Sequence, residues 1–562
     1  MAQSLHGRSQ YMMGSETPEI ITLQIGHYAN FVGTHWWNIQ ESSFVYDPSA
    51  QVELDHAVLF REGETSKREV TFTPRLLAVD LRGSLGHLRR RGQLYSEPAP
   101  AEPDRLWQGH TVRHKQETRA PTSLRRRLDR LDGATDDDDK DVCQGKREED
   151  ESDGTQEEDD TTPAAAVLDG EVRVWSDFLG THLNPWTVHI LSEHIHENTN
   201  DPFDVFGFGE SQYLREDFRD DFEDRLRAYA EECDHLVGFH VLADECDGFG
   251  GVSAGALAHL SDEYPGRSAL VAPLQPPPAG ALSLPQAVHQ AVNTVLTLDA
   301  AARHASLCTP LSVQAEWTAP LVAPSYRRME NFEYKPELPY HSGAVLAAAL
   351  DTITLPWRRK RDPVPLYEVT SSLSYGGRTV AGVASSLPLG IGQNDYLSTW
   401  LEGGNLKLCS VTPGVGAVPD ESEIWSSCTV LRGVPDKQLR PAGVGSDPWL
   451  EVTGRRAAVR LREPLRTASP FPALFGPTVG RDGLLQPRCT KKDGVRAAPT
   501  AAALQSSRAV GDSLAALHAV TARFNIAKFH RFSAGGLETD DWAEVLERTS
   551  DLVRCYRPRE EV

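Results

Sequence analysis

A glycine-rich segment in the middle of the chain has the composition of a phosphate-binding loop. The apolar run 236–242 predicts a buried strand, and residues 244–255 join it to a helix expected over 256–263. Backbone N–H groups in such a loop bind phosphate when glycine lets the backbone come close. Ser253 could add a hydroxyl, and the glycines that could allow the approach are Gly248, Gly250, Gly251 and Gly255. Tight turns also need glycine, so the loop alone is a moderate signal.

A second strand, turn and helix lie near the N-terminus. Residues 20–25 predict a buried strand, Gly26 ends it, and apolar residues recur every three to four positions from Tyr28 onwards. The free N–H groups at the start of such a helix attract anions. The run 76–79 predicts another strand, which ends at Asp80, where open α/β sheets bind ligands. A single aspartate at a strand end is common, so Asp80 indicates a ligand site only together with the glycine-rich segment and the N-terminal strand, turn and helix.

These motifs must be positioned by alternating strands and helices, which is typical of an α/β protein. A further helix is predicted from Asp220, because Phe222, Leu226, Tyr229 and Cys233 share one face. Two more are predicted near the C-terminus, with Thr539 as the N-cap of the last one. The strand order within 362–512 is not predictable from its short apolar stretches. The 562 residues are enough for roughly three to four domains, or for two with large insertions.

The charge of the chain is unevenly distributed around a net value of −23. Such a balance argues against nucleic acid as a partner. Residues 136–160 hold fourteen carboxylates and three bases, whereas 112–130 hold seven Lys or Arg and two acids. A basic block followed by an acidic block with few apolar residues predicts a solvated, disordered insertion over 96–166, and an electrostatic docking tail is the alternative. The basic run 358–361 is interpreted as a short surface patch rather than an import signal.

The spacing of the cysteine, histidine and apolar residues argues against a disulfide scaffold, a metal site and a membrane span. Eight cysteines occur without any CxxC pair, which argues for free thiols and against a zinc ribbon or a disulfide scaffold. The four histidines within 182–196 have no recognised zinc spacing, so no metal site is predicted. No apolar run approaches the ~18 residues of a membrane span. The best candidate, 344–350, is far too short. We therefore expect any action at a membrane to occur through contacts or partners.

Four blocks, in chain order, resemble tubulin. The first, 19–33 together with the Trp36-Trp37 pair, is similar to the first strand and nucleotide loop, and the second, 74–83, is similar to the tubulin segment PRAxxVDLEPG. The third, 238–265, ends Asp-Glu-Tyr-Pro where tubulin has EEYP, and the fourth, 527–556, is similar to the C-terminal helices. The resemblance implies a Rossmann-like nucleotide-type domain, an intermediate α/β domain and C-terminal helices. The segments expected on this basis are 1–95, 96–166 for the insertion, 167–315, 316–512 for the intermediate region and 513–562.

The departures from tubulin resemble the Misato family. They are the acidic glycine loop, the charged insertion, and Trp175-Ser176-Asp177-Phe178 followed by Asn184-Pro185. That family is associated with mitochondrial distribution and morphology, in the cytosol and at the outer membrane. The resemblance therefore implies a cytoplasmic and peripheral outer-membrane protein, with mitochondrial surface proteins as partners. Tubulin or a cytosolic chaperonin are the alternative partners, in which case the chain would be an assembly factor.

The residues of the nucleotide-type site are altered from those of tubulin. Arg82 stands where VDLEPG has its glutamate, which removes a hard-oxygen contact for Mg²⁺, and Tyr28 and Phe31 add bulk to the first loop. Asp244, Glu245 and Asp247 stand at the entrance of the phosphate loop, and Arg82 is hypothesised to pair with one of them. The candidate degenerate site consists of Gly26, His27, Asn30, Asp80, Arg82, Gly248, Gly250, Gly251, Ser253 and Gly255.

No residue is predicted to be catalytic. The acidic loop that tubulin-type hydrolysis requires is matched to 341–345, which holds no carboxylate, and the guanine-reading Asn is matched loosely to Ala300. We therefore expect a non-catalytic protein without a cofactor. GTP remains a conceivable ligand, and a divergent GTPase remains an alternative function.

Overall fold

The computed structural model describes most of the chain and leaves out several segments. The described residues are 17–45, 51–64, 70–86, 88, 121–131, 165–278, 280–317, 324–397, 399, 407–416, 423–438, 456–486 and 494–557.

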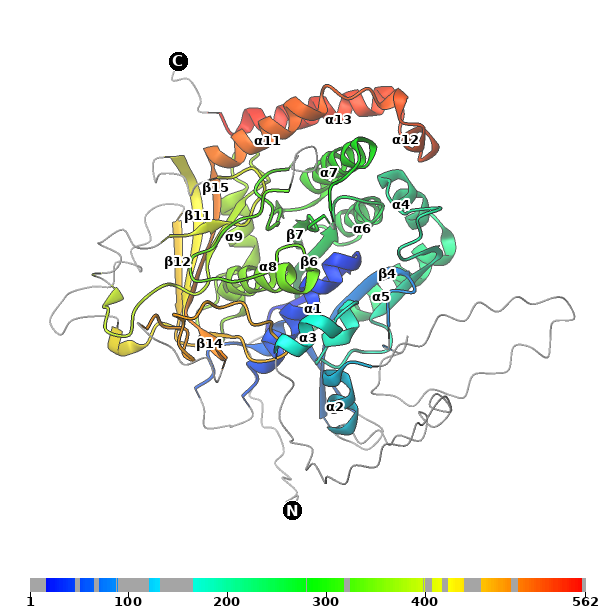
Figure 1. Cartoon of the computed structure of the whole chain (residues 1–562). Helices are drawn as coiled ribbons and strands as arrows, with labels where there is room; N and C mark the ends of the chain where they lie inside the picture. Colours follow the sequence, from blue (N-terminus) through cyan, green and yellow to red (C-terminus); the bar gives the residue numbers. More distant parts are fainter. Residues whose placement is uncertain are drawn as a thin grey trace, which may run out of the picture.

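Six strands that lie between residues 19 and 308 build a parallel sheet (Figure 1). Its order is β5-β4-β1-β6-β7-β8, and every neighbouring pair is parallel. The strands are β1 (Glu19–Ile25), β4 (Leu76–Arg82), β5 (Val188–Ile195), β6 (Leu236–Asp244), β7 (Ser268–Leu274) and β8 (Leu307–Cys308). The chain runs outwards from β1 to one side and from β6 to the other. Ligands bind open α/β sheets at the carboxyl ends of the strands where the order reverses, here β1 and β6.

Helices cover both faces of this sheet, because its strands are apolar on both faces. Ile20 packs into a core with α1 and α8, whereas Ile21 packs into a second core with α5, α6 and α7. The helices are α1 (His27–Ser42), α4 (Phe206–Tyr213), α5 (Glu216–Glu232), α6 (Phe249–Glu263), α7 (Leu284–His304), α8 (Pro339–Ile353) and α9 (Leu366–Leu373). The predicted strands 20–25, 76–79 and 236–242 and the helices after Gly26 and around Phe222 are confirmed.

A second, five-stranded sheet follows in the order β10-β9-β15-β11-β12. Its strands are β9 (Gly382–Ser386), β10 (Cys409–Ser410), β11 (Ile424–Arg432), β12 (Arg456–Leu461) and β15 (Thr500–Ser507). Helix α8 contacts both α1 and this sheet, and its residues from Tyr340 to Ile353 are buried. The apolar run 344–350 is therefore part of a core helix. Two small ribbons, β2 (Phe60–Glu64) with β3 (Val70–Pro74) and β13 (Leu465–Arg466) with β14 (Ala497–Ala498), complete the sheets.

The C-terminal helices lie along the outer side of α7 (Figure 1). They are α11 (Arg508–Thr521), α12 (His530–Ala534) and α13 (Thr539–Cys555), and the 3₁₀ turn η10 (Ile526–Lys528) precedes α12. Arg548 of α13 forms two hydrogen bonds of 2.8 Å with Asp299 of α7. The predicted N-cap, Thr539, is wrong by one residue. Glu538 caps α13, because its side chain and that of Asp541 bond reciprocally to backbone N–H groups.

Part of the predicted solvated insertion is folded. Residues Ser123–Leu131 form helix α2, whose Leu124 is buried in the same core as α1. Thr122 donates to the carbonyl of Asp177, and Glu171 of helix α3 (Ala165–Glu171) accepts from Ser123. The prediction is wrong here because these few apolar and polar contacts anchor an otherwise basic segment. The acidic block 136–160 lies outside the described residues.

The basic run 358–361 is only partly a surface patch. Arg358 ends the 3₁₀ turn η6 (Leu355–Arg358) and is 2% exposed. It bonds Asp351 of α8 at 2.7 Å, and Arg432 of β11 bonds the other oxygen of Asp351 at 2.5 Å. A burial of this kind requires the charge pairing that the three residues provide. The interpretation as a surface patch is therefore wrong for Arg358.

Candidate functional site

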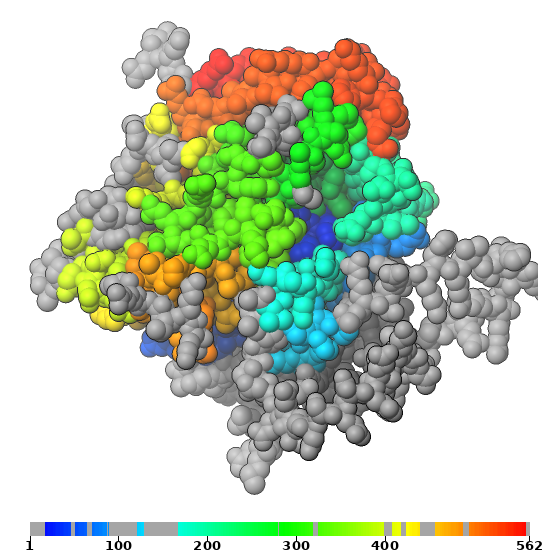
Figure 2. Space-filling model, in the orientation of Figure 1, coloured from blue at the N-terminus to red at the C-terminus, as the bar shows by residue number. Residues whose placement is uncertain are grey.

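The carboxyl ends of β1, β4 and β6 bring together several of the predicted site residues. Gly26 turns the chain from β1 into α1 with φ of 129°, a conformation that other L residues rarely adopt. In the space-filling view, the blue segment that contains α1 is visible in a small area between green and teal parts of the chain (Figure 2). We call the following group the strand-end site: Gly26, His27, Asn30, Asp80 and Asp244.

Asp80 is fully buried and surrounded by hydrogen-bond donors. Its Oδ2 lies 3.0 Å from His27 Nδ1 and accepts from Asn30 Nδ2 at 3.2 Å. It also accepts from the indole N–H of Trp175 at 2.9 Å, and Oδ1 accepts from the backbone N–H of Leu81. Burial favours the neutral acid, but the charge and hydrogen bond of His27 hold the pKa of Asp80 below its ordinary value. The site therefore retains an ionised carboxylate, both of whose oxygens already have hydrogen-bond partners within the chain.

Asp244 ends β6 and binds the first turn of α1. Its Oδ2 accepts from the backbone N–H of Tyr28 at 2.9 Å, and its Oδ1 accepts from that of Ala29 at 2.7 Å. Burial and the charge of Asp247 raise the pKa of Asp244, and the two N–H groups act in the opposite direction. These N–H groups are the ones that would attract an external anion to this helix. A side chain of the protein already occupies them.

Glu245 and Asp247 accept fewer hydrogen bonds than Asp80 and Asp244 do. Glu245 is fully buried, and neither of its carboxyl oxygens has a hydrogen-bond partner among the described residues. Burial raises its pKa to about 8. Asp247 accepts from the backbone N–H of Phe249 at 2.9 Å, and burial raises its pKa to about 7. A buried carboxyl without donors is expected to hold its proton near neutral pH.

The predicted phosphate loop is mostly helix. Helix α6 begins at Phe249, seven residues before the predicted start at 256, so three of the four glycines lie inside it. Helix α4 packs closely against it. A Cβ at any of the four would come within 3.0 Å of a neighbour: Gly248 against Phe203, Gly250 against Thr297, Gly251 against Phe206 and Gly255 against Tyr213. The glycines therefore serve close packing of the chain against itself, which helix propensity alone does not predict.

Two predicted site residues have other roles. Arg82 is exposed, whereas Asp244 and Glu245 are buried, and Arg82 forms no ion pair within the described part of the chain. The hypothesised pairing of Arg82 with Asp244, Glu245 or Asp247 is therefore wrong, because Arg82 lies at the exposed end of β4. The hydroxyl of Ser253 donates to the carbonyl of Gly250 inside α6.

Two residues outside the prediction complete the cluster. Trp175 comes from the 3₁₀ turn η4 (Trp175–Phe178), and the ring of His196 lies 4.0 Å from that of His27. The sequence signal for Trp175 was its place in the Trp-Ser-Asp-Phe string, which carried no contact information. His196 follows β5, and only the strand order brings it beside α1.

The segment matched to the tubulin hydrolysis loop lies in a helix. Residues 341–345 are in the first half of α8 and are buried. His341 Nε2 lies 2.8 Å from a carboxylate oxygen of Asp169 in α3. Ala300 is buried in α7.

Known protein families match both of the chain segments that contribute acids to the strand-end site. The model of the Misato Segment II tubulin-like domain matches residues 18–130, which include Asp80, and that of the Tubulin domain matches 164–359, which include Asp244. Protein misato homolog 1 of Danio rerio is 32% identical over 97% of this chain and 98% of its own length. The chain belongs to the Misato family. Protein misato homolog 1 of Homo sapiens is 30% identical over 97% of this chain and 99% of its own length, and Protein misato of Drosophila melanogaster is 31% identical over 96% and 98%.

Membership of the Misato family agrees with the tubulin-like fold predicted from the four blocks. The two matched regions together contain all six strands of the parallel sheet and the central helix α8. None of the helices in the described residues combines the length and the apolar character that crossing a bilayer requires. Within the same residues no group of three or more His, Cys, Asp or Glu is arranged to hold a metal ion.

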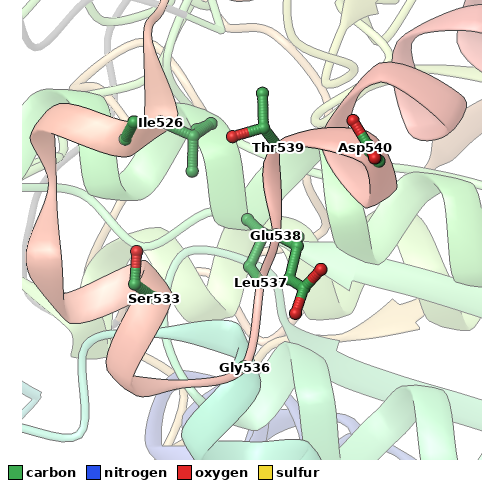
Figure 3. Close-up of a pocket in the computed structure, with 8 residues that line it drawn as sticks. Ile526, Ser533, Gly536, Leu537, Glu538, Thr539 and Asp540 are labelled. Atoms are coloured by element: carbon green, nitrogen blue, oxygen red, sulfur yellow. The ribbon is translucent and has the colours of Figure 1, made fainter.

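A cavity elsewhere in this Misato-family chain has no nucleotide-like character. It has a volume of about 540 Å³ and opens between η10, α12 and the start of α13 (Figure 3). Its charged lining residues are Glu538 and Asp540, and no basic residue lines it. Two carboxylates without a base oppose the binding of a polyanion such as GTP.

Proposed function

We propose that this chain is a non-catalytic tubulin-like protein that acts in mitochondrial distribution and morphology. The cellular part of the proposal comes from the family, whose members the resemblance associates with the cytoplasm and the mitochondrial outer membrane. The chemical part comes from the strand-end site. The chain would then act through its folded surface and its partners.

The observation that carries the chemical part is the crowding of acids where a nucleotide would place its phosphates. Asp80 and Asp244 are buried at the carboxyl ends of β4 and β6, and Asp247 follows directly. Asp80, whose pKa is lowered, would repel a phosphate placed beside it, because like charges about 4 Å apart repel by ~1 kcal/mol in water and by more when partly buried. The close packing of Phe203, α4 and α7 against the start of α6 also leaves its glycines without the open backbone that phosphate binding uses. Both features support a protein that works without nucleotide hydrolysis.

The first test is nucleotide binding to the purified full-length chain. Calorimetry with GTP and GDP, with and without Mg²⁺, is expected to show no heat of binding at high micromolar nucleotide, and thermal unfolding is expected not to shift. Mg²⁺-dependent binding would contradict the chemical part of the proposal. A divergent GTPase would then become the leading function.

The second test addresses the cellular part. The chain is expected to be enriched on washed mitochondria, and its depletion is expected to change their distribution or shape. Re-expression of the Glu245→Gln variant should restore the distribution as well as the unaltered chain does, because no acid at this site is needed for catalysis. Co-purification of tubulin or a chaperonin without enrichment on mitochondria would contradict this part and favour an assembly factor.

A further inference from the structure

The second sheet ends in a strand whose outer edge is open within the described part of the chain. Strand β12 is the last strand of this sheet, beyond β11 (Figure 1). It pairs with β11 in a parallel ladder, and among the described residues no backbone hydrogen bond joins 456–460 to any other segment. An open strand edge presents N–H and C=O groups that can pair with an added strand.

Basic side chains accompany this open edge. Arg456 and Arg460 lie on one face of β12, because side chains four positions apart in a strand share a face. Val459 and Leu461 are buried on the other face. Arg462 follows β12 directly, and its side chain is 70% exposed. Positive charge therefore lies next to the open backbone groups.

Further basic residues are held beside β12 through Glu53. The carboxylate of Glu53 accepts from the backbone N–H of Arg462 at 2.7 Å, and its backbone carbonyl accepts from that of Lys360 at 2.8 Å. Lys360 and its neighbour Arg361 are exposed. The run that contains them and the end of β12 therefore form one surface.

The acids at this surface are already engaged. Backbone N–H groups bind the carboxylate of Glu53, and Asp436 lies 3.3 Å from Arg460 and 3.8 Å from Arg462. Lys437, next to Asp436, is exposed. The surface therefore keeps an excess of positive charge, although the chain as a whole carries −23. We call the following residues the basic edge: Arg456, Arg460, Arg462, Lys360, Arg361 and Lys437.

We propose that the basic edge binds an extended acidic segment of a partner protein, which adds a strand beside β12. The open backbone groups would supply main-chain hydrogen bonds, and the basic side chains would pair with carboxylates of the added strand. Charged side chains on an edge strand oppose pairing with apolar strands or with strands of the same charge. This inference goes beyond the proposed function, because it names the chemistry of a partner and concerns a surface far from any nucleotide-type residue in the sequence.

The other long edge strand provides a comparison within the molecule. Strand β5 lies at the edge of the six-stranded sheet and is eight residues long. It carries Glu193 and no Lys or Arg. An acidic segment would therefore find charge complementarity at β12 but not at β5.

The test is binding of a fluorescently labelled peptide to the purified full-length chain, followed by anisotropy. The peptide has about eight residues, within the range of ordinary strands, and alternates Glu with Val. We expect saturable binding that weakens as salt is added. A Gln-Val peptide of the same length should not bind, because it lacks the charge. The Glu-Val peptide methylated on alternate backbone nitrogens should bind at least about tenfold more weakly, because it lacks main-chain donors. Equal binding of the methylated peptide, or no binding of the Glu-Val peptide, would overturn the inference.

Charge reversal locates the binding surface. The double variant Lys360→Glu with Arg462→Glu is expected to weaken binding of the Glu-Val peptide about tenfold, because two attractions become repulsions. The matched control is Arg267→Glu with Arg523→Glu, which changes the net charge equally at exposed residues outside the second sheet. Thermal unfolding checks that both variants are folded. Equal losses of affinity in the two variants would place the binding elsewhere and overturn the inference.

Two other occupants of the basic edge are separate outcomes of the same assay. Peptide binding that appears only after the acids of 136–160 are replaced by their amides would assign the edge to the acidic block of this chain. Binding of phosphatidylserine vesicles that the Lys360/Arg462 variant weakens, without binding of the peptide, would assign it to a membrane surface. Either result would overturn the assignment to an acidic partner segment.

Discussion

Asp80 and Glu245 are two fully buried carboxyl groups whose surroundings are opposite. Asp80, on β4, accepts from donors on α1, η4 and its own strand, and its pKa is lowered. Glu245, directly after β6, has no partner among the described residues, and its pKa is raised to about 8. Burial is the same in both places, so the donors decide which carboxyl is charged. One region is a satisfied polar network, and the other is a buried acid that the fold tolerates in its neutral form.

A third buried carboxyl group, that of Asp351, differs from both because it has two cationic partners. Asp351→Asn keeps the shape of the side chain but leaves the buried Arg358 and Arg432 without their counter-charge. We expect the free energy of unfolding to fall by about 3–5 kcal/mol, as when one partner of a buried ion pair is removed. Urea unfolding measures it. The control, Asp362→Asn on the exposed loop nearby, should change little. A loss for Asp351→Asn as small as that of the control would show that the pairing contributes no stability.

The variant Asp80→Ala removes the buried carboxylate that several hydrogen-bond donors surround. The donor groups of Asn30 and Trp175 would lose an acceptor in a buried position, at about 1–3 kcal/mol for each unsatisfied group. We expect a total loss of about 2–4 kcal/mol in the free energy of unfolding, because the site relaxes in part. Chemical denaturation followed by tryptophan fluorescence would report it. If Asp80→Asn, which keeps one carbonyl acceptor, lost more than the alanine variant, the donor network would not be the cause.

The variant Glu245→Gln tests the role of the buried carboxyl group that lacks a hydrogen-bond partner, through the pH dependence of stability. The folded chain keeps the Glu245 proton up to about pH 8, whereas the unfolded chain releases it near its ordinary value of 4.5. The neutral acid therefore supports the fold fully below pH 4.5, and stability is lost as pH rises towards 8. Relative to the variant, the unaltered chain should lose about 2–3 kcal/mol between pH 6 and pH 8. Asp247 titrates in the same direction in both proteins, so their difference isolates Glu245. Parallel pH profiles would mean that Glu245 is ionised in the folded chain.

Arg82→Glu is expected to have the smallest effect. Arg82 is exposed and forms no ion pair in the described part of the chain, so stability should change by less than about 0.5 kcal/mol. The same thermal or chemical unfolding assay applies. A loss above 1 kcal/mol, about twice that limit, would restore the hypothesis that Arg82 pairs with one of the acids Asp244, Glu245 and Asp247.

Prediction from sequence succeeded where a local pattern had one dominant cause. The strands around residues 20–25 and 236–242 are apolar on both faces, and only burial between two helix layers explains such runs. Gly26, Asn30 and Asp80 were placed together correctly, because Gly26 follows β1, Asp80 lies near the end of the neighbouring parallel strand β4, and Asn30 is in the first turn of the helix that follows Gly26. The same reasoning could not include Trp175, which reaches Asp80 from 95 positions away through an irregular segment.

The sequence by itself determined the alternation of strands and helices, the family, and the concentration of acids after β6. It did not determine what those residues do. Glycines that could have opened a backbone to phosphate instead allow Phe203, α4 and α7 to pack closely on the start of α6, and only the positions of these neighbours decide between the two roles. The protonation of Asp80 and Glu245 likewise depends on donors that come from other elements. Hydrogen bonds and packing act over a few ångströms between residues far apart in the chain, so the tertiary structure settled these roles.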